Sequence, residues 1–154
     1  MTASQKNNEA EGSVTIHTPS RYSYLRMIRQ AVTDLARRSG LTDFKASQLE
    51  MAVDEACTNI IEHSYGGEAG SLESPAHPGL RVNLMNGGDR IVVEIVDRGA
   101  GFDFNGQPGV TPDAYLDEGR NRGLGMYIIR RFVDDITYER GTPAGNVLRL
   151  TKLI

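Results

Sequence analysis

The feature that most constrains the fold is a pair of alternating segments, LRVNLMN at residues 80–86 and RIVVEIVD at residues 90–97. Apolar residues recur at every second position in both segments, which is the period of a strand with one buried face. The tripeptide GGD between them consists of residues that tight turns favour. The sequence therefore predicts an antiparallel hairpin here.

Three further segments have strand patterns. Residues 13–18, SVTIHT, alternate and are rich in β-branched side chains, and Pro19 ends the predicted strand. Residues 135–140 and 145–154 predict a second hairpin, joined by a turn over residues 141–145. These segments supply the remaining strands of the predicted sheet.

Two segments before the first hairpin have the apolar spacing of helices. The first is predicted from an N-cap at Ser20 to about residue 38. The second runs from Thr42 or Asp43 to about Tyr65, where a pair of glycines ends it. The chain thus places two helices between its first and second strands.

Residues 98–123 form a long segment that is rich in Gly, Pro and Asp and has no regular period. Most connections in compact domains are about 4 to 6 residues long, and much longer ones are usually functional or disordered. A helix is predicted directly after it, at residues 124–133, and its lack of a broad polar face indicates that it is mostly buried. The long segment therefore requires a functional explanation.

The order of these elements is strand, two helices, hairpin, long loop, helix and hairpin. This order predicts an α+β two-layer sandwich with a mostly antiparallel, mixed sheet and helices on one face. We expect a single domain over residues 13–154, because the chain has 154 residues and no internal repeat. The polar residues 1–12 are predicted to be a disordered tail.

Charge and composition exclude several classes of protein. The formal net charge is −3, from 17 Lys and Arg against 20 Asp and Glu, so the chain lacks the basic character of a nucleic-acid binder. It has neither a membrane-spanning apolar run nor a signal-peptide pattern. The single Cys57 cannot form an internal disulfide, which suits a reducing compartment. We expect a soluble, cytoplasmic protein that binds neither nucleic acid nor membrane.

The second predicted helix carries a polar stripe. At about 100° of rotation per residue, Glu55, Asn59 and Glu62 fall in a narrow wedge opposite an apolar face. Such a wedge is more often a solvated helix face than a ligand site. His63, at its margin, is more often an ordinary residue favoured by the helix dipole. The helix alone leaves both explanations open.

The motif DRGAG, residues 97–101, directly follows a predicted strand. Its two glycines let the backbone turn sharply and approach a flat ligand, and the Asp97 carboxylate can accept a hydrogen bond from an exocyclic amine. A plain turn explains this motif equally well when it is taken alone.

The motif RGLGM, residues 122–126, lies where the long segment meets a helix. Glycines there leave N–H groups open at a helix start, where the dipole contributes roughly half a positive charge, and this suits a phosphate chain. Positive charge nearby comes from Arg120, Arg122, Arg130 and Arg131. Helix spacing points the last two toward solvent or a protein partner as readily as toward phosphate. A lone GxG at a helix start is commonly a tight turn.

The order of these motifs is more specific than any one of them. ExxxN on a helix, DxGxG after a strand, a Gly- and Pro-rich loop and GLGM opening a helix resemble the N box and the two Gly boxes of the GHKL superfamily of ATPases and kinases. The resemblance spans the chain from about residue 14 to its end, and VDEACTNIIEHSYGG and RGLGMYIIRRFVDD are most similar to the anti-sigma-factor serine kinases. It implies a Bergerat-type ATP-binding fold, ATP with Mg²⁺, and a protein substrate.

The resemblance also implies roles for individual residues. Glu55 matches the general base, Asn59 the magnesium ligand, and Asp97 the carboxylate that binds the adenine amine. Gly99 and Gly101 match the glycines beneath the base.

The segment at residues 122–126 matches the phosphate-binding segment of the family, including its two glycines. The nucleotide contacts implied there are Arg122, Gly123, Leu124, Gly125 and Met126. The loop from Phe102 to Asn121 matches the lid that closes over the nucleotide. Several relatives carry an arginine where this chain has Asn121, so Arg120 or Arg122 would have to contact the γ-phosphate.

In function, the resemblance implies a protein serine/threonine kinase that is also an anti-sigma factor. It would phosphorylate a STAS-type antagonist protein and hold a sigma factor when that antagonist is modified, and a homodimer is implied too. The alternative is a non-catalytic or slow nucleotide-dependent switch that sequesters a partner, and the sequence does not separate the two. A histidine kinase is disfavoured because it needs a phospho-accepting helical hairpin, and a gyrase- or chaperone-type ATPase because it normally has a transducer domain.

Overall fold

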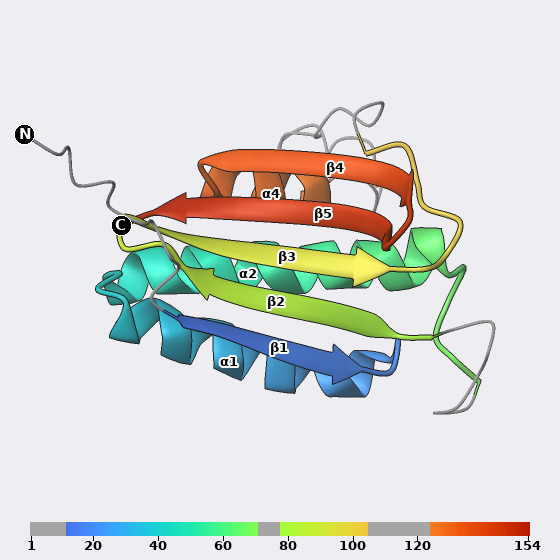
Figure 1. Cartoon of the computed structure of the whole chain (residues 1–154), viewed down its shortest axis with the longest axis horizontal. Helices are drawn as coiled ribbons and strands as arrows, with labels where there is room; N and C mark the ends of the chain where they lie inside the picture. The colour runs from blue at the N-terminus through green and yellow to red at the C-terminus, as the bar shows by residue number, and fades with distance from the viewer. Residues whose placement is uncertain (1–11, 71–77, 105–123) are drawn as a thin grey trace, which may run out of the picture.

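The computed structural model describes residues 12–70, 78–104 and 124–154. Its strands form one five-stranded sheet in the order β1-β2-β3-β5-β4, and every neighbouring pair is antiparallel (Figure 1). The strands are β1 (Gly12–Thr18), β2 (Leu80–Asn86), β3 (Arg90–Asp97), β4 (Asp135–Thr142) and β5 (Gly145–Leu153).

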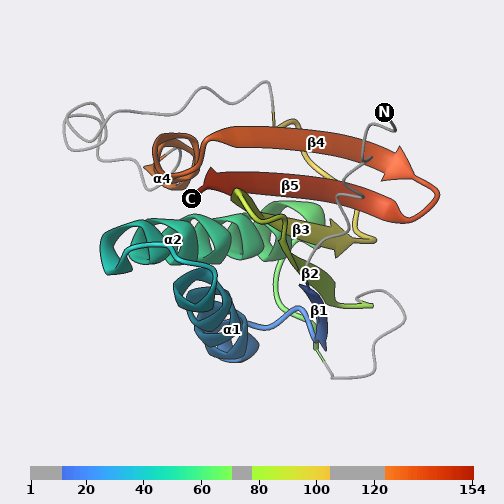
Figure 2. The same cartoon turned by 60° about the vertical axis from the view of Figure 1, so that its left-hand side comes forward.

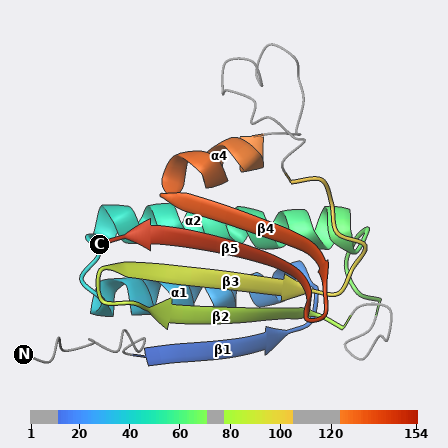
Figure 3. The same ribbon diagram turned by 45° about the horizontal axis from the view of Figure 1, so that its top comes forward.

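Helices cover one face of this sheet (Figure 2). They are α1 (Leu25–Arg38), α2 (Asp43–Asn59) and α4 (Leu124–Phe132). A 3-10 turn, η1 (Tyr22–Tyr24), precedes α1, and a π-helical segment, η2 (Ile60–Ser64), continues α2. Helix α2 contacts both α1 and α4, so it is the central element of the helical layer (Figure 3).

The predicted α+β sandwich with helices on one face is confirmed, and both hairpins form where the alternation predicts them. One refinement concerns the sheet, which is antiparallel throughout the described residues rather than mixed. Most of the predicted N-terminal tail lies outside the described residues, but Gly12, assigned to that tail, is the first residue of β1. Within the described ranges, no helix has both the length and the apolar character to cross a membrane.

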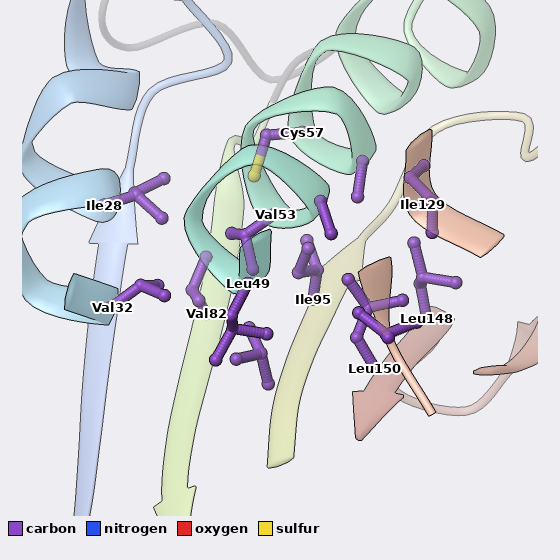
Figure 4. Close-up of a cluster of buried hydrophobic side chains, with 14 of the residues drawn as sticks. Ile28, Val32, Leu49, Val53, Cys57, Val82, Ile95, Ile129, Leu148 and Leu150 are labelled. Carbon is purple, nitrogen blue, oxygen red and sulfur yellow. The ribbon is translucent and has the colours of Figure 1, made fainter. Parts of the chain in front are cut away.

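The hydrophobic core fills the space between the sheet and the helices. Strand β2 contributes every second side chain to this core. Leu80, Val82 and Leu84 are buried beneath the helices, and the residues between them are half-buried. Side chains from the helices meet those of the strands across this layer (Figure 4). Fully buried members include Ile28, Val32, Leu49, Val53, Ile95, Ile129, Leu148 and Leu150.

The start of the first helix differs from the prediction. Ser20 is not its cap, because helical structure begins with η1 and neither η1 nor α1 has a side-chain cap hydrogen bond. The Ser20 hydroxyl is fully buried without a hydrogen-bond partner among the described residues. The Ser20 carbonyl accepts a hydrogen bond from the Ala69 N–H at 3.1 Å. A tertiary contact with the loop after η2 therefore overrides the local capping preference.

The second helix begins as predicted and ends with a change of pitch. Thr42 is the N-cap of α2, and its hydroxyl accepts a hydrogen bond from the Lys45 N–H at 3.2 Å. The α-helix is regular to Asn59, and the π-helical turn then continues to Ser64, one residue before the predicted end. Apolar spacing does not predict such a wider turn, and π turns are frequent at functional sites.

A buried lysine fixes the C-terminal end of α4 against α2. The Lys152 ammonium donates hydrogen bonds to the Phe132 carbonyl at 2.7 Å and to Gln48 Oε1 at 3.0 Å. A cation at this end of a helix is also favoured by the helix dipole. The opposite end of α4 is the one that meets the predicted site residues.

We expect Ile129→Ala to destabilise the fold by about 2 to 5 kcal/mol, because Ile129 has no exposed surface and the change leaves a cavity between α4 and the sheet. Urea denaturation followed by circular dichroism measures this loss. Met27→Ala is the matched control, since Met27 is 61% exposed and its truncation should cost less than about 0.5 kcal/mol. Equal stabilities of the two variants would contradict the described packing of α4.

Candidate functional site

Glu55 and Asn59 face the first turn of α4. A Cβ atom added to Gly125 would lie 2.5 Å from Glu55 Oε2 and 3.7 Å from Asn59 Nδ2. Asn59 Nδ2 also donates a hydrogen bond to Met126 Sδ at 3.6 Å. The structure therefore brings together two motifs that are 70 residues apart in sequence, with Glu55 and Asn59 of the polar wedge facing α4. Any side chain at position 125 would displace the Glu55 carboxylate.

The Glu55 carboxylate is half-buried and has acidic neighbours. Partial burial raises the pKa of the Glu55 carboxyl above its usual value, and the negative charges of Asp54 and Glu62 raise it further. A carboxylate with a raised pKa accepts a proton more readily than an ordinary one. This property suits a general base.

Asp97 lies at the end of β3, where it is 1% exposed. Its Oδ1 atom accepts three hydrogen bonds, from the Ser64 hydroxyl at 2.5 Å, the Gly99 N–H at 2.9 Å and Asn146 Nδ2 at 2.9 Å. Its Oδ2 atom is buried and has no partner among the described residues. A buried carboxylate oxygen without a donor is costly, so this atom fits a ligand that brings an N–H group.

The two glycines of DRGAG are required by contacts within the protein. A Cβ atom at Gly99 would collide with the side chain and carbonyl of Ser64. Gly101 has a φ of 73°, which side chains disfavour, and its Cβ would lie 2.8 Å from the Arg140 side chain and 3.0 Å from Asn146 Oδ1. Contact with Ser64 thus explains Gly99, and the backbone conformation explains Gly101. Their place beneath a base stays a prediction.

Several residues of this region were not expected from the sequence. Ser64 and Asn146 contact Asp97 directly, but they come from η2 and the start of β5, far from the glycine motif in sequence. The Tyr65 hydroxyl donates to the Gly79 carbonyl at 2.6 Å and accepts from the Arg98 N–H at 3.0 Å. No sequence motif marks these contacts, because each joins separate elements.

The first residues of the predicted lid belong to the core. Phe102 and Phe104 are 8% and 3% exposed, and the Phe102 ring stacks on Tyr138 with centroids 5.3 Å apart. A lid would therefore begin after Phe104. The remainder of the predicted lid, with Arg120 and Asn121, lies outside the described residues.

The predicted phosphate-binding segment, residues 122–126, lies only partly within the described residues. Arg122 and Gly123 lie outside the described residues, and Leu124 is the first residue of α4. Gly125 and the buried Met126 contact Glu55 and Asn59 as described above.

Arg130, Glu62 and His63, which the sequence analysis also considered, contact other parts of the protein. Arg130 donates a hydrogen bond to the Phe104 carbonyl at 3.4 Å. Glu62 accepts a hydrogen bond from the Tyr22 hydroxyl at 3.2 Å, and the His63 ring lies 6.1 Å from the Phe102 ring. Glu62 thus ties the end of the helix to η1 while its charge acts on Glu55.

Comparison with known proteins identifies the family. Residues 18–152 match the family model of the histidine kinase-like ATPase domain, which is most of the chain. The chain belongs to this family. Membership implies ATP as the nucleotide, in agreement with the donor that Asp97 Oδ2 requires.

The most similar curated relatives include serine-protein kinases named RsbW. The one from Bacillus pumilus is 27% identical over 152 residues, covering 96% of this chain and 89% of the relative. The one from Bacillus cereus strain AH187 is 29% identical over 130 residues, covering 80% and 74%. The predicted resemblance to the GHKL superfamily and its serine kinases is confirmed.

Solved structures show the same fold. The RsbU and RsbW domains of a Mycobacterium tuberculosis protein align with a TM-score of 0.61 and 15% identity, over 92% of this chain and 32% of that chain. The SiaB–SiaC complex from Pseudomonas aeruginosa aligns with a TM-score of 0.57 and 17% identity, over 92% and 89%.

We expect Glu55→Gln to stabilise the fold at neutral pH, by less than about 1 kcal/mol because water still screens the half-buried group. The pKa of Glu55 is raised in the folded state, so its contribution to stability is present below the unfolded value of 4.5 and is lost as pH rises through the folded value. The advantage of the variant should therefore vanish at about pH 4. Urea denaturation at pH 7.5 and pH 4 measures both differences.

Glu50→Gln is the matched control for this experiment. Glu50 lies on the α1 side of α2, where its carboxylate accepts a hydrogen bond from Thr33 at 3.0 Å. Its replacement should give no gain at pH 7.5. A Glu55→Gln variant that is no more stable than the wild type at pH 7.5 would contradict the described environment of Glu55.

Proposed function

We propose that this protein is an ATP- and Mg²⁺-dependent protein serine/threonine kinase that also acts as an anti-sigma factor. Its substrate would be a serine or threonine of a STAS-type antagonist, and its second partner a sigma factor. The observation that carries the proposal is that the Glu55 carboxylate lies against Gly125 at the first turn of α4. Support also comes from the relatives, which are named serine-protein kinases.

In this proposal the base of ATP lies against Asp97. The unpartnered Oδ2 atom would accept a hydrogen bond from the adenine amine, while Oδ1 keeps its three protein donors. The phosphates would lie at the first turn of α4, where open N–H groups and the helix dipole favour negative charge. Arg122, Gly123, Leu124, Gly125 and Met126 are the proposed contacts there, with Arg120 or Arg122 on the γ-phosphate.

Asn59 is the proposed magnesium ligand. Mg²⁺ favours oxygen ligands and keeps several waters, so one amide oxygen with phosphate oxygens is a sufficient set. When bound, ATP would supply the phosphoryl group and Mg²⁺ would neutralise part of the phosphate charge. The described residues contain no group of three or more His, Cys, Asp or Glu side chains that could hold a metal by themselves.

Glu55 is the proposed general base. Its carboxylate lies one helical turn before Asn59, and its raised pKa favours taking a proton from the hydroxyl of a protein substrate. The Glu55 carboxylate lies against Gly125 at the start of α4, so its surroundings depend on the anchoring of α4 by Lys152. A lid formed by residues after Phe104 would exclude water from the reaction.

A nucleotide-dependent binding switch is the second candidate. The similar structure from Pseudomonas aeruginosa is a complex of two proteins, SiaB and SiaC, which supports partner binding on this fold. Asn121, in place of an arginine found in relatives, also favours slow transfer. In either case we propose a cytoplasmic homodimer.

We expect the wild type to transfer labelled phosphate from ATP to a STAS-type antagonist in the presence of Mg²⁺. Glu55→Gln should lower the transfer rate by at least about 100-fold, because a general base typically accelerates a reaction by roughly 10²- to 10⁴-fold. Glu50→Gln, on the same helix but outside the site, should transfer at the wild-type rate. Equal, negligible transfer by all three proteins would favour the binding switch over the kinase.

We expect Asp97→Asn to fold normally but to bind ATP at least about tenfold more weakly. The three donors on Oδ1 would keep the amide oxygen in that position, so the amide nitrogen would face the adenine amine with the wrong polarity. Calorimetric titration with ATP measures the change. Asp135→Asn, at an exposed position of β4, is the control, and an unchanged affinity of Asp97→Asn would contradict the assignment.

A further inference from the structure

Two side chains, those of Ser64 and Asn146, hold Asp97 by hydrogen bonds. The prediction from sequence gave neither of them a role. They are 5% and 2% exposed, and each joins Asp97 to a backbone segment. We propose that Ser64 and Asn146 are positioning residues that make the site select a 6-amino purine over a 6-oxo purine. This inference rests on the proposed nucleotide site and deepens it.

The direction of the Ser64 hydrogen bonds is fixed by its neighbours. The Gly101 N–H donates to Ser64 Oγ at 2.9 Å, so the hydroxyl is already an acceptor on that side. Its single hydrogen is therefore available for Asp97 Oδ1, 2.5 Å away. The Ser64 carbonyl also accepts from the Ala100 N–H at 2.9 Å, which holds the π-helical turn to the glycine loop.

The orientation of the Asn146 amide is fixed in the same way. Its Oδ1 atom accepts from the Gly141 N–H at 3.0 Å, which assigns the nitrogen to the opposite side. Nδ2 then donates both to Asp97 Oδ1 at 2.9 Å and to the Gly99 carbonyl at 3.0 Å. Asp97 and Asn146 are also paired residues of β3 and β5, so the backbone holds them at a constant separation.

The consequence is an asymmetric carboxylate. All three donors, from Ser64, Gly99 and Asn146, converge on Oδ1, and Oδ2 is left as a buried acceptor without a described partner. A 6-amino group offers this atom a donor, whereas a 6-oxo group places lone pairs against it. Sites that leave a buried polar group unpaired reject the wrong ligand strongly.

Loss of either positioning residue should weaken this selection. Without the Ser64 hydroxyl or the Asn146 amide, Oδ1 has fewer donors and the carboxylate can rotate, so both oxygens become available to solvent or ligand. The phosphate end of the site involves neither residue and should be unaffected. The signature is therefore a change in the ratio of affinities rather than in affinity alone.

The experiment measures binding of ATP and of inosine triphosphate by calorimetry to the wild type, Ser64→Ala and Asn146→Ala. Inosine triphosphate differs in carrying an oxygen at position 6. The wild type should bind ATP at least about tenfold more tightly than inosine triphosphate. In each variant the affinity for ATP should fall about tenfold, while the affinity for inosine triphosphate should change less than about threefold. Each variant should therefore lose most of the preference for ATP.

Ser39→Ala and Asn83→Ala are the matched controls. Ser39 Oγ donates to the Leu35 carbonyl at the end of α1, and Asn83 Nδ2 donates to Glu94 on β3. Both should keep the wild-type ratio. Circular dichroism verifies folding, and should one site variant fail to fold, the other decides.

Equal weakening of both nucleotides in the variants would overturn the inference, because it would indicate a merely structural role. A wild type that binds both nucleotides equally would overturn it too, together with the adenine contact of Asp97. A wild type that binds neither would refute the proposed function itself. A retained ATP preference in both folded variants would refute only the role of Ser64 and Asn146.

Discussion

The packing of the apolar face of α2 against the sheet is the interaction on which the rest of the site depends. This face includes Leu49, Val53 and Ala56, all fully buried, so Glu55 and Asn59 must lie on another side of the helix. The same continuous helical segment then delivers Glu55 and Asn59 to α4, and Ser64 to Asp97. Both groups of predicted site residues are therefore positioned by one helical segment, whose orientation the hydrophobic core fixes.

Local periodicity predicted much of this fold. The alternation in β2 and β3, the turn residues between them and the apolar spacing of α2 each report how one element meets the core, and these features are readable without long-range information. The motif order also predicted which residues would converge. Glu55, Asn59 and Gly125 do meet, although their chemical roles stay predictions until they are measured.

The remaining features depend on contacts between distant segments, which periodicity does not encode. Ser20 has the residue type of an N-cap, yet burial against the loop at Ala69 removes it from that role. Asn146 reaches Asp97 only because β3 and β5 are neighbours in the sheet. Phe102 looks like part of a polar loop in sequence, but stacking on Tyr138 makes it core.

The unpartnered Oδ2 atom of Asp97 has a consequence for how such a chain can change over time. A buried acceptor without a donor at Asp97 and a half-buried carboxylate at Glu55 both cost free energy of folding. Selection for stability alone would favour replacing Glu55 by a neutral residue. Groups with such a cost persist only where selection for function outweighs the stability they remove.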